Sequence, residues 1–310
     1  MSGPHGVERL GAWIADHVAV AAIVAVALGL IAPSSGLASH SNVLLAVLVL
    51  FTAAQVDPRR LSELRSRMLA IPALSVGVLL VLTAVAWLIS RPFGGDVRDG
   101  ILCLGLASTE VASVGLIGLA EGDSILGLGV LTGSLIASAV LGPLLVGLLA
   151  QTHGHVTSLS LLGRFGLVVL LPLAAGLAIR SMVPRLSETE GALTGCAALT
   201  VCALLYAAIS GVHGGHQLVQ ELVASISFMI VALAAGALLS RGLAHRHHLD
   251  PTSVLLTSWL RDFAVAAVLA TQAFGTAAGG VAGVYGAVML LGGAAAATFI
   301  RRRSTTQKPA

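Results

Sequence analysis

An arginine and an aspartate stand next to each other inside an apolar stretch that is long enough to cross a lipid bilayer. The stretch covers residues 251–274, and Arg261 and Asp262 lie near its middle. A charge at the centre of a bilayer costs about 2.5–3.5 kcal/mol on insertion scales, so charges kept at that depth usually face a cavity, a partner or an ion path. We therefore take this pair as a candidate for binding or moving an ion.

A second acid, Glu110, lies inside the apolar stretch 98–120, and hydroxyl side chains accompany both acids. Such oxygens are ligands for hard cations, and a buried carboxylate can instead carry a proton. The candidate ion-coupling residues are Ser108, Thr109, Glu110, Ser113, Thr132, Ser134, Thr257, Ser258 and Asp262. A purely structural alternative is that Arg261 pairs with one of the acids and that the hydroxyls bond to carbonyls of their own helices.

The surrounding chain has the composition of a polytopic membrane protein. Apolar residues make up 56% of its 310 residues and charged residues 10%, whereas soluble domains carry about 25% charged residues. Ten apolar runs are expected to be transmembrane helices, because an open strand would leave unpaired backbone groups in lipid. The runs are 12–32, 41–56, 68–90, 98–120, 123–150, 159–182, 191–212, 217–240, 251–274 and 278–300. The sequence therefore predicts an all-α membrane fold.

The basic residues predict the orientation of these helices. Only Arg91 and Arg98 lie in connections on one side, and Arg164 and Arg261 lie within runs. All the others fall in the tails and in connections on the opposite side: Arg9, Arg59, Arg60, Arg65, Arg67, Arg180, Arg185, Arg241, Arg246, Arg301, Arg302, Arg303 and Lys308. By the positive-inside rule both termini are cytoplasmic, in a multi-pass protein of the plasma membrane. The net charge of +3 thus reports topology and does not indicate nucleic-acid binding.

Ten helices divide into two halves of five, and an odd number per half would invert the second half relative to the first. Glu110 and Asp262 fall in the fourth and ninth runs, which are equivalent places in the halves. Inverted repeats with interrupted helices are common in secondary transporters. We predict inverted repeats at 1–150 and 159–300, with 151–158 as the linker.

Several stretches, in the same order along the chain, resemble the bile acid:sodium symporter superfamily. Residues 51–60 (FTAAQVDPRR) look like the loop after that family's second helix, and 119–123 (LAEGD) look like its turn between the fourth and fifth. Residues 171–180 (LPLAAGLAIR) resemble its sixth helix, while the ninth run and the arginine-rich end of the tenth match in position. The resemblance covers nearly the whole chain.

The resemblance implies ten helices in two inverted repeats, arranged as a panel domain (spans 1, 2, 6 and 7) and a core domain (spans 3–5 and 8–10). Spans four and nine would be discontinuous and cross each other, with the substrate bound near the crossing. Transport would follow from movement of the core against the panel.

This chain departs from the family's sodium ligands. In the Glu-x-Gly-x-Gln-Asn motif of span nine, Thr257 stands at the Glu position, Arg261 at the Gln position and Asp262 at the Asn position. Arg261 would then lie about where a sodium ion lies, so that a fixed positive charge replaces a mobile one. In span four Ser113 matches the family's serine, but Val114 replaces its asparagine.

Two other parts of the sodium sites also differ. The glutamine that the family supplies from span three is missing, because 68–90 contains none. Hydroxyls persist in span five as Thr132 and Ser134. We expect coupling either to sodium through a remodelled site or to protons through Glu110 or Asp262.

The sequence thus predicts a cation-coupled secondary transporter of a small organic anion or a bile-acid-like amphipathic acid. The candidate substrate-binding residues are Glu110, Ser113, Arg261 and Asp262. Expected partners are that anion and the lipid bilayer, with no nucleic acid, no resident metal and no cofactor besides the coupling ion. The sequence does not indicate an oligomeric state.

The sequence also bears on three other classes of protein. An arsenite-type permease of the same superfamily would suit Cys103, but the missing glutamate of span nine argues against it. A non-transporting receptor or scaffold would not need two buried acids in equivalent spans. The chain shows no paired-aspartate or His-Glu zinc motif of an intramembrane enzyme, so we predict that it is not an enzyme.

Overall fold

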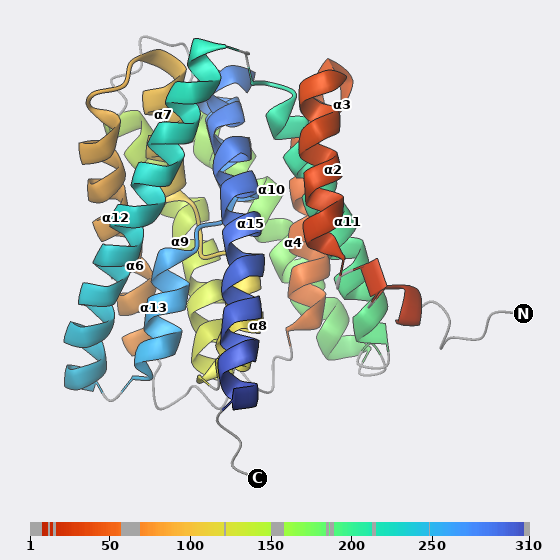
Figure 1. The fold of residues 1–310 in the computed structure, drawn as a ribbon, viewed down its shortest axis with the longest axis vertical. Coiled ribbons are helices and arrows are strands. Elements are labelled where there is room, and N and C mark those ends of the chain that lie inside the picture. Colours follow the sequence, from red (N-terminus) through yellow and green to blue (C-terminus); the bar gives the residue numbers. More distant parts are fainter. Residues whose placement is uncertain are drawn as a thin grey trace, which may run out of the picture.

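The regular elements of the structure are helices that run side by side in a bundle (Figure 1). This computed structural model describes residues 8–11, 13–14, 17–56, 69–120, 122–149, 158–183, 186, 189–212, 215–247 and 249–306. The predicted linker, except for residue 158, and the basic loop 57–68 lie outside these residues. The named helices are α2 (Val18–Ile31), α3 (Ser35–Ser39), α4 (Ser41–Gln55), α6 (Ala70–Ser90), α7 (Gly95–Leu106), α8 (Ala112–Leu119), α9 (Ser124–Leu149), α10 (Ser158–Met182), α11 (Glu190–Ile209), α12 (His216–His247), α13 (Pro251–Trp259), α14 (Phe263–Phe274) and α15 (Thr276–Thr306).

Five of these helices are long and apolar enough to cross a membrane by length and composition, among the residues described: α6, α9, α10, α11 and the part of α12 up to Leu243. Shorter apolar helices are α2, α4, α14 and residues 276–292 of α15. The prediction of an all-α membrane fold is therefore confirmed in its coarse form. The count of ten spans stays a prediction.

The apolar runs 98–120 and 251–274 are each split into two helices. The first is interrupted at residues 107–111, between α7 and α8, and the second at residues 260–262, between α13 and α14. Ala107 and Leu260, which end α7 and α13, adopt extended backbone conformations. Asp262 then restarts a helix, because its side chain accepts hydrogen bonds from the first backbone N–H groups of α14. A continuous hydropathy profile thus hides two breaks.

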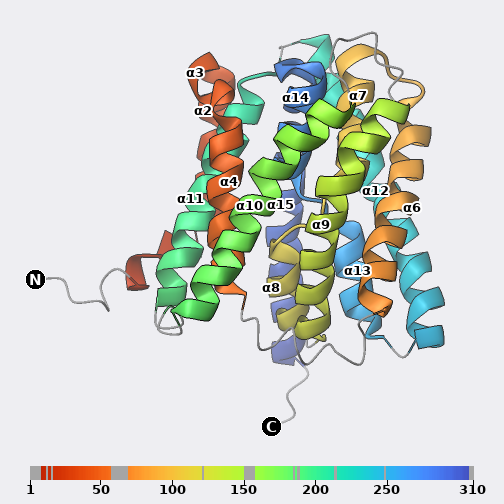
Figure 2. The same ribbon diagram turned by 180° about the vertical axis from the view of Figure 1, so that it is seen from behind.

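The helices form two groups in space (Figures 1 and 2). One group holds α2, α3, α4, α10 and α11, and the other holds α6, α7, α9, α12 and α13 together with α8, α14 and α15. Within the first group α10 and α4 pack closely, since a Cβ atom on Gly176 would lie 2.7 Å from the Leu50 carbonyl oxygen. Small residues allow such close approach of membrane helices.

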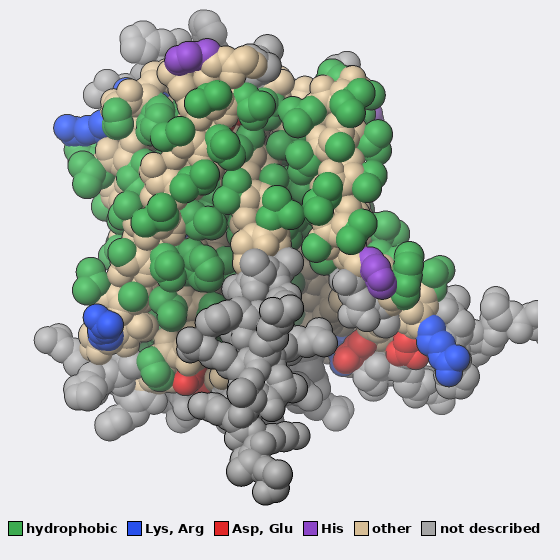
Figure 3. Space-filling model, viewed as in Figure 1, with side chains coloured by type: hydrophobic (Ala, Val, Ile, Leu, Met, Phe, Trp, Pro, Cys, Tyr) green, Lys and Arg blue, Asp and Glu red, His purple; other side chains and the backbone are tan. Residues whose placement is uncertain are grey.

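Apolar side chains cover the middle of the surface seen in Figure 3, and the charged side chains visible there lie toward its upper and lower edges. Large exposed apolar side chains of the protein include Ile230 and Val223 of α12. An exposed apolar belt of this extent is typical of a protein surrounded by lipid.

Candidate functional site

The two breaks cross each other and pair through their backbones. An antiparallel bridge joins Thr109 in the first break to Arg261 in the second. The Glu110 N–H donates to the Leu260 carbonyl oxygen at 3.0 Å, and the Asp262 N–H donates to the Ser108 carbonyl oxygen in the first break at 2.9 Å. An unpaired backbone N–H or C=O group costs several kcal/mol in hydrocarbon. The hydrogen bonds between the two breaks avoid part of this cost.

Helix α9 fixes this crossing from one side. The Ser134 hydroxyl accepts the Thr109 N–H at 3.0 Å, and the Ser138 hydroxyl donates to the Leu106 carbonyl oxygen at 2.6 Å, where α7 ends. Across the crossing, the Thr109 hydroxyl donates to the Thr257 carbonyl oxygen at 2.8 Å. The hydroxyls near the break therefore replace the helix hydrogen bonds that the break removes.

Three charged side chains are enclosed at the crossing. Arg261 is 0% exposed, Asp262 4% and Glu110 5%. Asp262 Oδ1 accepts the backbone N–H groups of Ala264 at 2.9 Å and Val265 at 3.0 Å, which makes it the N-cap of α14. The sequence-predicted acids thus meet inside the protein and away from its outer surface.

Arg261 has few direct partners for a fully buried guanidinium. Its Nη2 donates to the Gly105 carbonyl oxygen at 3.5 Å, and its backbone N–H donates to the Tyr285 hydroxyl at 3.2 Å. Its Nε and Nη1 are buried without a hydrogen-bond partner. Among the described residues no salt bridge joins Arg261 to Asp262 or Glu110, so the direct ion pair considered from the sequence is not formed.

The other predicted ion-coupling residues divide into two kinds. Four hydroxyls donate to carbonyls of their own helices, as the structural alternative expected: Thr132 to Leu128 (2.9 Å), Ser134 to Leu131 (2.9 Å), Thr257 to Ser253 (2.7 Å) and Ser258 to Val254 (2.6 Å). By contrast, the Ser113 hydroxyl and Glu110 Oε2 are buried without a hydrogen-bond partner. The Ser108 hydroxyl is also buried without a hydrogen-bond partner, although it lies near the Asp262 carboxyl group. Unsatisfied polar atoms gather around Glu110.

Asp250, which directly precedes α13, links the start of α13 to the start of α9. Asp250 Oδ2 accepts the Ser253 N–H at 2.7 Å, which caps α13, and the Asp123 N–H at 3.3 Å. Partial burial raises the pKa of Asp250, but the hydrogen bonds from Ser253 and Asp123 outweigh it, and the pKa is lowered. An ionised Asp250 therefore ties α13 to the start of α9.

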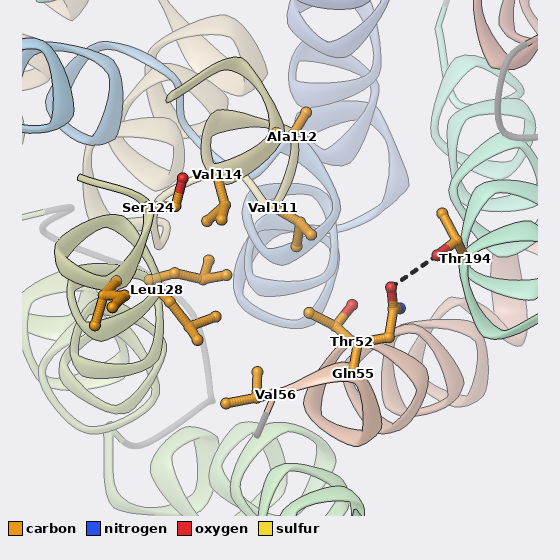
Figure 4. Close-up of a pocket in the computed structure, with 12 residues that line it drawn as sticks. Thr52, Gln55, Val56, Val111, Ala112, Val114, Ser124, Leu128 and Thr194 are labelled. Carbon is orange, nitrogen blue, oxygen red and sulfur yellow. Dashed lines mark hydrogen bonds between the residues drawn. The ribbon is translucent and has the colours of Figure 1, made fainter. Parts of the chain in front are cut away.

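A cavity of about 420 Å³ lies beside the crossing (Figure 4). It is lined in part by α8, which lies in the half of the bundle nearer the C-terminal end of α15 (Figure 1). Side chains of α4 and α11 face those of α8 and α9 across it. Its lining is Thr52, Gln55, Val56, Val111, Ala112, Val114, Gly115, Ser124, Ile125, Leu128, Leu131 and Thr194. The cavity therefore separates the two helix groups at this end of the bundle.

The cavity wall is largely apolar and carries a few uncharged polar groups. The Thr194 hydroxyl donates to Gln55 Oε1 at 2.9 Å across the α4–α11 side (Figure 4). The Thr52 hydroxyl is buried and has no hydrogen-bond partner. None of the four predicted substrate-binding residues lines the cavity, but Glu110 directly precedes Val111, which does.

Sequence reasoning missed two residues of the core. Tyr285 of α15 is 0% exposed, places its hydroxyl on the Arg261 backbone and packs edge-on against Phe228. Glu221 of α12 is also 0% exposed, with Oε2 unpartnered and Oε1 accepting from Gln217. The only sequence signal for Tyr285 was that it is the single tyrosine in the glycine-rich run 276–292.

These features define a class of protein: a polytopic membrane protein in which two interrupted helices cross at a buried, charged centre. The chain belongs to the sodium bile acid symporter family, whose sequence model matches residues 42–221. Predicted membership in this superfamily is thereby confirmed, and it makes the chain a membrane transporter of the bile acid symporter superfamily, in agreement with the prediction that it is not an enzyme. No curated protein matches the chain. The matched stretch contains Glu110 but ends before Arg261 and Asp262.

Proposed function

We propose that the protein is a secondary transporter that moves an amphipathic organic acid, such as a bile-acid-like anion, by cation-coupled alternating access. The cavity beside the crossing is the observation that carries this proposal. Its volume of about 420 Å³ and its apolar wall suit an apolar molecular body, and its few hydroxyl and amide groups suit polar substituents.

The acid group of the substrate would lie at the α8 end of the cavity. Among the residues that the structure describes, no charged side chain contributes to the lining. Val111 and Ala112 stand at the N-terminal end of α8 and line the cavity, and a helix N-terminus favours a negative charge. The buried Arg261 lies behind this wall, in the break that pairs with residues 108–110. Helix dipole and guanidinium thus both attract an anion there.

Alternating access would need a cavity that opens toward one side of the membrane at a time. At the opposite end, among the described residues, Ser41, Leu204, Thr271 and Thr276 contribute to the lining of a space of about 10 Å³. With the basic connections on the cytoplasmic side, the larger cavity would face the cytoplasm, as in an inward-facing state. The group α2, α3, α4, α10 and α11 would be the panel, and the remaining helices the core of the two proposed inverted repeats.

The alternative function, an arsenite-type permease, is not supported by the position of Cys103. Cys103, which suggested it, is 0% exposed in α7 and does not line the cavity. The amphipathic acid remains the substrate class that the cavity favours.

Filling the cavity should stop substrate binding without unfolding the protein. Gly115 lines the cavity, and a Cβ atom there would meet no atom within 4 Å. Gly115→Leu is expected to weaken binding of a probe bile acid such as cholate by at least tenfold, because the added side chain occupies the space that the ligand needs. Isothermal calorimetry on the purified protein would measure this.

The matched control is Gly163→Leu in α10, which also adds a leucine where a Cβ atom meets nothing within 4 Å, but on an exposed part of the bundle. It should bind cholate as the wild type does. If both variants bind equally well, the cavity is not the binding site.

The orientation can be tested independently of the substrate. The basic connections predict that reporters fused at the C-terminus or inserted within 57–67 lie in the cytoplasm. A membrane-impermeant thiol reagent should therefore fail to label cysteines placed there in intact cells, and should label them after permeabilisation. Labelling of either position from outside would contradict the inward-facing assignment.

A further inference from the structure

The three enclosed side chains at the crossing cannot all be ionised without leaving a net charge inside the protein. Arg261, Asp262 and Glu110 are all at most 5% exposed. A guanidinium stays protonated in proteins, so the group carries one negative charge when both acids are ionised and none when one acid holds a proton. Because an uncompensated buried charge is costly, the state with a single bound proton is favoured.

The ionised acid of this state is Asp262. Its Oδ1 accepts two backbone N–H groups, from Ala264 and Val265, at the N-terminus of α14. Both the capping hydrogen bonds and the helix dipole favour a negative charge in this place. Asp262 also follows Arg261 directly in the chain, so its charge offsets the neighbouring guanidinium without a direct salt bridge.

The protonated acid is Glu110. Its Oε2 is buried and accepts no hydrogen bond, whereas Asp262 Oδ1 accepts two, at 2.9 and 3.0 Å. The nearby Asp262 carboxylate repels a second negative charge. The groups that face the Glu110 carboxyl are the Asp262 carboxylate, the Tyr285 hydroxyl and the backbone N–H groups of Val111, Ala112 and Phe263.

We propose that Glu110 carries the one proton exchanged in each transport cycle, and that Asp262 remains ionised as the fixed counter-ion of Arg261. This inference rests on the transport function proposed above. An anion bound against Val111 and Ala112 lies next to Glu110, which repels it when ionised and does not when protonated. Proton and anion therefore favour each other's binding, which is the thermodynamic requirement for symport.

The same geometry makes a sodium ion unnecessary at the crossing. Arg261 already places a positive charge among the oxygens of the two breaks, and a second cation close to it would be repelled. Proton binding converts the Glu110 carboxylate to the neutral acid, and release to water on the other side restores the carboxylate. No other group needs to change its charge.

Infrared spectroscopy of the purified protein tests the proton assignment without any substrate. The C=O stretch of a protonated carboxyl group is separate from the amide and carboxylate bands, and uniform ¹³C-glutamate labelling shifts the glutamate contribution only. We expect a buried protonated-carboxyl band at neutral pH that shifts on glutamate labelling, does not shift on aspartate labelling and falls in Glu110→Gln. Glu221→Gln is the control for the other buried glutamate and should leave the Glu110 component intact.

Two outcomes would overturn the assignment. A band that shifts only with labelled aspartate and disappears in Asp262→Asn would place the proton on the other acid. Loss of the glutamate band in Glu221→Gln, with no further component removed by Glu110→Gln, would show that Glu110 is ionised. The labelled wild type needs no substitution, so a variant that fails to fold does not prevent the decision.

Transport in sodium-free proteoliposomes then tests the coupling, with cholate as the probe. The wild type should accumulate cholate when an inward proton gradient is imposed, and Glu110→Gln should lose this response while still exchanging cholate across the membrane. Uptake that requires sodium in the wild type would refute proton coupling. If the wild type moves no cholate although the infrared result is as expected, the proposed substrate class fails and the proton site does not.

Discussion

Asp262→Ala is expected to lower the free energy of unfolding by about 3–5 kcal/mol, more than any other single truncation at the crossing. The substitution removes the N-cap of α14, whose loss alone costs about 1 kcal/mol. It also leaves the fully buried Arg261 without its nearest counter-charge, and an uncompensated buried ion accounts for most of the expected loss. Chemical denaturation in detergent, followed by circular dichroism, would measure the difference.

Asp250 offers a matched control for this prediction. It caps α13 in the same way, through the Ser253 N–H, but it is only partly buried, and among the described residues no buried arginine interacts with it. Asp250→Ala should therefore cost about 0.5–2 kcal/mol, the range for loss of a cap alone. Asp262→Asn keeps a capping oxygen and should fall between the two. Equal losses for Asp262→Ala and Asp250→Ala would show that Arg261 does not depend on Asp262.

Gly105→Val should destabilise the protein by at least about 2–3 kcal/mol, because α7 and α6 touch through their backbones at this residue. A Cβ atom on Gly105 would lie 2.5 Å from the Ala86 Cβ and 2.7 Å from the Leu82 carbonyl oxygen. Backbone atoms cannot move aside as a flexible side chain can. The Gly105 carbonyl oxygen also accepts from Arg261, so displacement of α7 should disturb the crossing itself.

Gly77→Val in α6 carries the same change of helix propensity and serves as the control, since a Cβ atom there meets nothing within 4 Å. It is expected to change stability by less than about 1 kcal/mol. Thermal unfolding of the three proteins would compare them directly. Similar unfolding temperatures for Gly105→Val and the wild type would mean that the α6–α7 contact is not essential to the fold.

The helix breaks at 107–111 and 260–262 show which features of the fold hydropathy can predict and which it cannot. Hydropathy averages over a window and stays high through both stretches, so by itself it predicts two unbroken helices. The resemblance to the symporter superfamily did imply discontinuous helices, and the structure shows them. The position of each break depends on contacts far away in the chain, such as Thr109 with Ser134 and with Thr257.

The amino-acid sequence by itself determined that this is a helical membrane protein, that it resembles the bile acid symporter superfamily, and that Glu110, Arg261 and Asp262 are buried. Composition and hydropathy suffice for this because lipid forces apolar helices and penalises isolated charges. Only the tertiary structure decided that Arg261 pairs with neither acid, that Tyr285 contacts its backbone and that the cavity lies between α4, α8, α9 and α11. These features arise where segments distant in sequence meet, and their distances and unsatisfied atoms exist only once the helices have packed.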